Sequence, residues 1–140
     1  MKNKKDRTIN ILKSYKEIIA VYLFGSFADG YYRRGSDIDI GVLFSSSLKE
    51  LETLSLSLEI GEELERKLKE KVDLITMNSA PCDLVVRCIK GTLLLDKNPT
   101  ERATFEARIL SKHYDYKKFL KLHMPYFLER VKEGKIGEIG

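Results

Sequence analysis

Two spacings of hydrophobic residues recur along this chain, and they predict where its helices and strands lie. Residues 4–17 carry Ile9, Leu12 and Tyr15 at helical intervals, and the apolar run 18–24 follows as a strand. Residues 37–44 are predicted as a second strand, 48–70 as a long helix and 71–77 as a third strand. A helix from 78 to about 90, a short strand at 92–95 and a helical region from 100 follow, with Pro125 expected to kink or split the last helix.

This order of elements predicts an α+β fold, in which helices pack on one face of a small mixed β-sheet. Only about a dozen residues separate the first two strands, which favours antiparallel pairing over a helical crossover. At 140 residues, 43% of them hydrophobic, the chain is expected to form a single domain, 1–140, with a C-terminal helical region from about 100. The leucines of the long helix recur at intervals compatible with 3.6 residues per turn and are interpreted as ordinary helix packing: Leu51, Leu54, Leu58, Leu64 and Leu68.

Composition and charge narrow the class of protein. The longest apolar runs have about seven residues, too few for a membrane span. No apolar segment follows the basic residues 1–5, as a signal peptide would require, and Cys82 and Cys88 lack metal-ligand spacing. We therefore expect a cytoplasmic protein with reduced cysteines. The net charge of +4, from 25 basic and 21 acidic residues, suits a nucleotide or RNA partner without demonstrating one, since basic surfaces of this size are often only solubilising. No stable nucleic-acid binding is expected.

The stretch GSFADGYYRRGSDIDIGVLF, residues 25–44, places two acids inside an apolar strand pattern. Alternate side chains of a strand share a face, so Asp37 and Asp39 project together. Their Cα atoms would lie about 6.5–7 Å apart, where two like charges repel by ~2–3 kcal/mol at an effective dielectric near 20. A hard divalent cation such as Mg²⁺ is the natural compensation, because it prefers carboxylate oxygens together with substrate phosphates.

Asp73 is a third acid in an apolar strand pattern, Val72-Asp73-Leu74-Ile75. If its strand lies beside residues 37–44, three carboxylates converge, as in two-metal chemistry at phosphorus. Gly25 and Ser26 directly follow the first strand, where a glycine lets the backbone approach a phosphate and a following helical turn offers unpaired N–H groups. The structural alternative is an Asp-x-Asp on the solvent face of an edge strand and an ordinary Gly-Ser turn. Either feature alone is more often structural, but their conjunction is uncommon.

These residues resemble a known family. Gly25-Ser26, ten intervening residues, Asp37-Ile38-Asp39 and the later Asp73 are similar to the motif of the DNA polymerase β-like nucleotidyltransferase superfamily. Within it, the short chain resembles the minimal nucleotidyltransferases (MNT), especially the MntA-type antitoxins that pair with HEPN-domain toxins. The tail FEARILSKHYDYKKFLKLH also resembles the C-terminal helix of those antitoxins.

The resemblance implies roles for individual residues. Gly25 and Ser26 would bind the triphosphate, Asp37 and Asp39 would ligate Mg²⁺, and Asp73 would complete the metal site and help to activate the nucleophile. The implied reaction transfers AMP from ATP to a tyrosine hydroxyl of a HEPN ribonuclease toxin, which it silences. Many relatives have arginine before the glycine corresponding to Gly30, whereas this chain has Asp29 there. Arg33 or Arg34 could supply the missing phosphate contact instead.

Several further side chains have open interpretations. Tyr31 and Tyr32 could stack on a base or fold onto the core, Arg87 and Lys90 are interpreted as surface charges, and His113 and His123 as surface or interface residues. Aromatic residues of the C-terminal region could close the core or form an interaction patch: Phe105, Tyr114, Tyr116, Phe119, Tyr126 and Phe127, together with Ile109. Two other functions stay open, namely nucleotidyl transfer to a small-molecule hydroxyl and neutralisation of a partner by contact alone.

Overall fold

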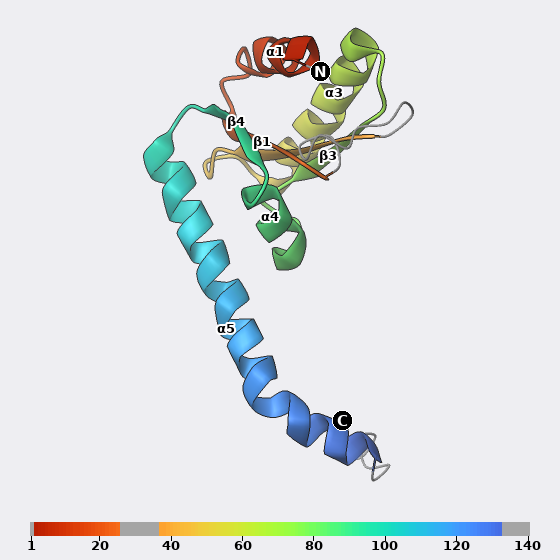
Figure 1. Cartoon of the computed structure of the whole chain (residues 1–140). Helices are drawn as coiled ribbons and strands as arrows, with labels where there is room; N and C mark the ends of the chain where they lie inside the picture. Colours follow the sequence, from red (N-terminus) through yellow and green to blue (C-terminus); the bar gives the residue numbers. More distant parts are fainter. Residues whose placement is uncertain (1, 26–36, 133–140) are drawn as a thin grey trace.

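The computed structural model describes residues 2–25 and 37–132, which form a four-stranded mixed sheet with helices on both faces (Figure 1). Helix α1 (Lys2–Leu12) and strand β1 (Ile18–Phe24) come first, and β2 (Ile38–Phe44) follows. Helix α3 (Glu50–Leu68), strand β3 (Val72–Thr76), helix α4 (Cys82–Ile89) and strand β4 (Thr92–Asp96) lead to the long helix α5 (Pro99–Lys132). Each helix and strand of the described chain was predicted within a few residues.

The strands lie in the order β3-β2-β1-β4. Strand β1 pairs antiparallel with both β2 and β4, whereas β2 and β3 run parallel. The predicted antiparallel pairing of the first two strands and the mixed character of the sheet are therefore confirmed. Strand β3 forms one edge of the sheet.

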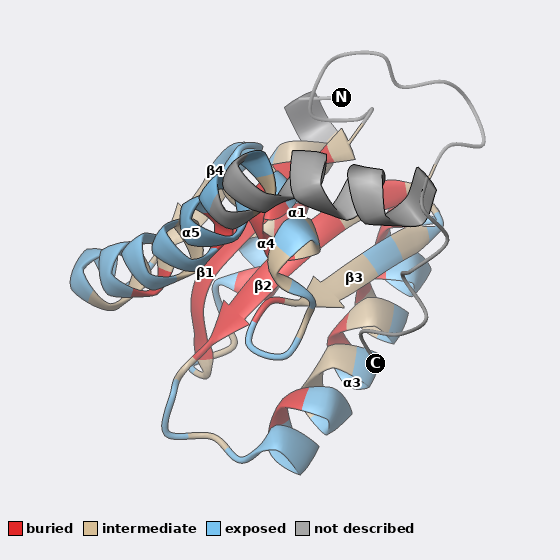
Figure 2. Cartoon of the chain, turned by 90° about the horizontal axis from the view of Figure 1, so that it is seen from below, coloured by how far each residue is buried: buried red, intermediate tan, exposed pale blue. Residues whose placement is uncertain are grey.

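Helices cover both faces of the sheet, so the prediction that they pack on one face was wrong. Helices α1 and α3 lie on one side, where Leu12, Ile60 and Leu64 join the core with alternate residues of β1 and β2. Helix α4 and the first part of α5 cover the other side, where Val85 and Phe105 are buried. The physical reason is that β1 is buried along its whole length, as Figure 2 shows, so it needs apolar partners on both faces.

Helix α5 starts against the sheet and then extends away from it (Figure 1). Phe105 is buried and Ile109 packs beside the core, while Tyr114 and Tyr116 are each 57% exposed. The helix runs unbroken through Pro125, so the predicted split is absent, and its ribbon bends in the C-terminal part. Within the described chain, no helix is both long and apolar enough to cross a membrane.

Candidate active site

Three neighbouring strand ends bring the candidate residues side by side. Asp39 of β2 pairs with Asp73 of β3 on one side and with Phe24 of β1 on the other. Gly25 follows Phe24, and Asp37 precedes β2 two residues before Asp39, so it projects from the same face. Strand β3, which carries Asp73, thus lies beside β2, as the convergence of the three acids requires.

The pKa of Asp39 is shifted by its burial and by the neighbouring acids. Burial raises the pKa of the Asp39 carboxyl, and the nearby charges of Asp73 and Asp37 raise it further. The guanidinium of Arg87 acts in the opposite direction on the same pKa. Asp73 itself is exposed, whereas Asp37 and Asp39 are half-buried. The site is thus a cluster of negative charge that Arg87 compensates only in part among the residues that the structure describes.

Gly25 has a positive φ of 74° and lies against Asp39. A Cβ atom at this position would stand 2.3 Å from Asp39 Oδ2, far inside van der Waals contact. Glycine is therefore required here both by the backbone conformation and by the closeness of the carboxylate. The sequence analysis expected Gly25 to let the backbone approach a phosphate, and the structure adds that the residue leaves space for the Asp39 side chain.

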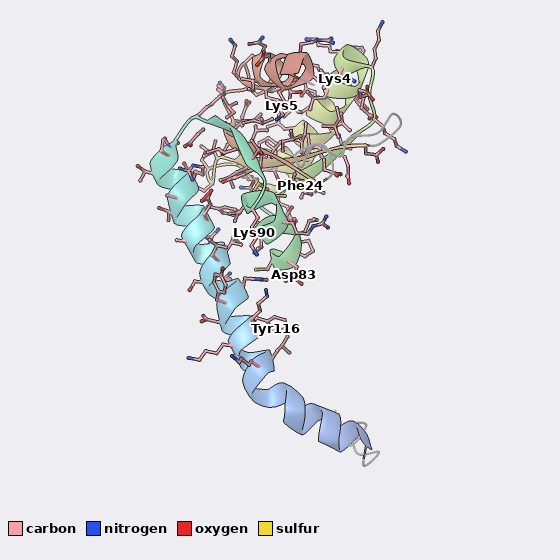
Figure 3. All side chains as sticks on the ribbon, viewed as in Figure 1. Lys4, Lys5, Phe24, Asp83, Lys90 and Tyr116 are labelled. Carbon is pink, nitrogen blue, oxygen red and sulfur yellow. The ribbon has the colours of Figure 1, made fainter. Side chains whose placement is uncertain are left out.

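Arg87, which the sequence interpretation gave as a surface charge, lies close enough to the acids to act on the pKa of Asp39. It is exposed on α4, and its Cζ atom lies 5.9 Å from the centroid of the Phe24 ring, next to Gly25. Figure 3 shows Phe24 in the region between the sheet and α4. No ion pair with Arg87 occurs within residues 2–25 and 37–132. The arginine thus adds positive charge beside the acids.

Two glycines bring α4 over this face of the sheet. A Cβ atom at Gly41 would lie 2.8 Å from Cys88 Sγ, and one at Gly91 would lie 2.4 Å from the Leu23 carbonyl oxygen. Gly41 shares the face of Asp39, two residues away. A glycine inside a strand indicates the close approach of another backbone. Gly41 is therefore the feature of the sequence from which the position of α4 and Arg87 above the acids could have been predicted.

The carboxylate oxygens of Asp37, Asp39 and Asp73 are suitable ligands for a hard divalent cation, although the three side chains do not point to a common position. Mutually repelling carboxylates with a raised pKa at Asp39 are the chemistry that Mg²⁺ would relieve. No three His, Cys, Asp or Glu side chains in the described part of the chain form a metal-binding group as they stand. The strands align the backbones of the three acids, and ligation would require their side chains to turn toward a shared ion.

Other candidate residues fall elsewhere. Ser26, Arg33 and Arg34 lie outside the described residues, as do Asp29, Tyr31 and Tyr32. His113 is buried on α5, with Nδ1 3.5 Å from Asp83 Oδ1 of α4, so its assignment to the surface was wrong. Cys88 is buried and Cys82 half-buried, and neither forms a disulfide.

Comparison with protein families identifies the fold. A family model described as polymerase beta, nucleotidyltransferase matches residues 6–100, which include all of the site. The chain belongs to this nucleotidyltransferase family. The predicted superfamily, the α+β nucleotidyltransferase fold and the assignment as a nucleotidyltransferase are therefore confirmed.

Two sequence relatives of this nucleotidyltransferase carry more specific names. MJ1379 of Methanocaldococcus jannaschii, provisionally named a protein adenylyltransferase, is 39% identical over 84 residues, 60% of this chain and 82% of that protein. The protein adenylyltransferase MntA of Shewanella oneidensis is 32% identical over 77 residues, 54% of this chain and 52% of MntA.

Two solved structures share the nucleotidyltransferase fold over nearly all of their length. A toxin-antitoxin structure with AMP-PNP has a TM-score of 0.70 and 23% identity, covering 89% of this chain and 98% of the matched chain. A tri-AMPylated Shewanella oneidensis HEPN toxin in complex with an MNT antitoxin gives a TM-score of 0.66 and 20% identity, covering 91% and 98%. At these identities the likeness concerns the fold.

Proposed function

We propose that this nucleotidyltransferase is an antitoxin that transfers AMP from ATP to a tyrosine hydroxyl of a partner HEPN ribonuclease toxin. The observation that carries the proposal is that Asp39 of β2 pairs with Asp73 of β3 and lies against Gly25, the residue that follows β1. The names of the two sequence relatives support protein adenylylation, and the AMP-PNP bound in one matched structure supports ATP as donor. The AMPylated HEPN toxin in the other supports the partner.

The proposed reaction is an in-line displacement at the α-phosphorus of ATP. The tyrosine oxygen forms a bond to that phosphorus, the bond to the bridging β-phosphate oxygen breaks, and pyrophosphate leaves. Asp73, the most exposed of the three acids, accepts the hydroxyl proton. Asp37, Asp39 and Asp73 would hold Mg²⁺, which would supply charge stabilisation for the phosphoryl oxygens.

The triphosphate is proposed to bind on the β1 side of the site. Gly25 leaves the backbone open there, and Ser26 follows it in the chain. Arg87 supplies a cation from α4 beside Phe24, and Arg33 or Arg34 is proposed to supply another. The cation of Arg87 lies over an aromatic ring and forms no ion pair within residues 2–25 and 37–132, so its donors are available there to phosphate oxygens.

The test is transfer of label from ATP labelled at the α-phosphate to the HEPN partner protein in the presence of Mg²⁺. Wild type should label the HEPN protein and abolish its ribonuclease activity, and the Asp37→Ala/Asp39→Ala double variant should do neither. Failure of the wild type to label this protein, or equal labelling by the double variant, refutes the proposal. Unimpaired neutralisation by the double variant without labelling would support neutralisation by contact alone.

A further inference from the structure

The outer face of α3 carries a row of exposed leucines. Leu51, Leu54 and Leu58 are 81%, 45% and 72% exposed, although the leucines of this helix were interpreted as ordinary helix packing. The opposite face of the helix packs against the sheet, where Ile60, Leu64 and Leu68 are buried. Leucines three and four residues apart lie on one side of a helix and form a continuous apolar strip. Such strips on a small protein indicate a binding surface.

A groove continues this strip onto the sheet. It lies between α3 and β3 and has a volume of about 500 Å³. Its apolar walls come from Leu54 and Leu58 of the helix and from Val72 and Leu74 of the strand, while Glu62 and Glu65 line it further along α3. An occupant that fits this lining combines apolar side chains with a basic one.

Among the described residues, the outer edge of β3 beside the groove is only partly used for hydrogen bonds, and at its end the Thr76 carbonyl accepts from the Ser79 and Ala80 N–H groups. The Ile38 N–H donates to the Lys71 carbonyl and the Met77 N–H to the Val42 carbonyl, which fixes the phase of the parallel ladder. In this phase Asp73 and Ile75 direct their backbone groups toward β2, and Leu74 directs its own outward. The outward N–H of Val72 is bonded to Glu65 Oε2, whereas Leu74 has no backbone partner within the described chain.

The order of the strands decides from which side an acceptor arrives. Gly25, where the triphosphate is proposed to bind, lies on the β1 side of Asp39, and Asp73 lies on the β3 side. An acceptor hydroxyl that reaches Asp73 without crossing the nucleotide therefore approaches from the free edge of β3. This step rests on the proposed function.

We propose that the acceptor segment of the partner protein binds as an extended strand along the free edge of β3. Its alternate side chains would point to opposite faces of the sheet. One set fills the α3–β3 groove with apolar residues and a basic residue near Glu62 and Glu65, and the other set carries the acceptor hydroxyl on the face of Asp73. Binding of the segment along this edge would thus both hold it in the groove and place its hydroxyl on the face of Asp73.

Amide hydrogen exchange tests the docking geometry directly. Adding the HEPN partner to the full-length protein should protect the Leu74 and Thr76 amides, which point outward from β3, and leave the β4 amides at the opposite edge unchanged. This measurement needs no catalysis, so it separates the docking proposal from the proposed function. Complex formation without protection at Leu74 and Thr76 overturns the strand-addition geometry.

A matched pair of variants tests the groove. Leu58→Lys removes apolar contact and places a cation beside a basic occupant, and it should raise KM for the partner by about tenfold or more while KM for ATP stays the same. Leu93→Lys, at a leucine 39% exposed on β4, should change neither value. Equal KM values for the partner in the two variants overturn the proposal. A second outcome also overturns the proposal. If the wild type self-associates, and Leu58→Lys converts it to a monomer without changing partner binding, a second copy of the chain occupies the groove.

Discussion

Replacement of Gly25 by alanine tests the link between backbone geometry and catalysis most sharply. The residue has a φ of 74°, a conformation that costs an L-residue about 1–2 kcal/mol. The added Cβ would also stand 2.3 Å from Asp39 Oδ2 and 3.2 Å from its Cγ atom. Real Cβ contacts essentially never fall under 3.0 Å, so a displacement of at least 0.7 Å, the difference between 3.0 and 2.3 Å, must occur between these groups.

Two consequences follow for Gly25→Ala. The backbone term predicts a loss of about 1–2 kcal/mol in the free energy of unfolding. The displacement of Asp39 predicts a fall of about a hundredfold in AMP transfer, because a shift near 1 Å in a reacting site costs about that factor. The loss should appear in kcat, since the proposed ligand is misplaced even when ATP is bound.

The measurements are urea denaturation followed by circular dichroism, and steady-state AMP transfer to the partner. Gly61→Ala is the matched control for stability, because Gly61 lies inside α3 and a Cβ there meets nothing within 4 Å. It should gain about 0.5–1 kcal/mol, as Gly to Ala does in a helix interior. A Gly25→Ala protein with wild-type stability and with transfer within about twofold of wild type would refute the reasoning.

Three further predictions concern other parts of the molecule. Arg87→Ala should raise KM for ATP about tenfold, whereas Arg108→Ala, an arginine 5.5 Å from the Phe105 ring on α5, should not; equal values contradict the phosphate role. Arg102→Ala leaves Asp96 and Glu106 without their cation and should cost about 1–3 kcal/mol in urea denaturation, against less than about 0.5 for Lys67→Ala at the more exposed Glu63 pair. Comparable losses would show that the Arg102 network is no stronger than a surface pair. Burial raises the pKa of the Cys88 thiol from 9.0 to about 12, so stability present below pH 9.0 should fall as the pH rises toward 12. Cys88→Ala should reduce that slope in urea titrations, and an unchanged slope contradicts this origin.

The elements of the fold could be predicted from the sequence because each carries a clear local period. The pairing of β1 with β2 followed from the shortness of their connection. The second helical layer was missed, although the unbroken apolar run 18–24 already indicated a strand buried on both faces. The leucines of α3 were misassigned for a related reason. Helical spacing shows that residues share a face, but both faces of α3 carry leucines, and only tertiary contacts decide which face is buried.

The acids of the candidate site could be predicted from the sequence, whereas the strand and the arginine that lie beside them could not. Asp37 and Asp39 interrupt an apolar strand at a spacing that puts them on one face, which is a local signal. The neighbour relation of Asp39 and Asp73 depends on the register of two parallel strands, and sequence spacing does not set that register. Arg87 reaches the site only because Gly41 and Gly91 allow α4 to approach the sheet, a contact between segments far apart in the chain.

The most direct test of the central claim is the intact mass of the HEPN partner after incubation with this protein, ATP and Mg²⁺, followed by peptide mapping. The account predicts a mass gain of one or more AMP groups on tyrosine, lost when Mg²⁺ is chelated and in the Asp39→Asn variant, while the Arg108→Ala control retains it. A partner that keeps its original mass with wild type, or gains the same mass with Asp39→Asn, would contradict the claim that the aligned Gly25, Asp39 and Asp73 form an adenylyltransferase site.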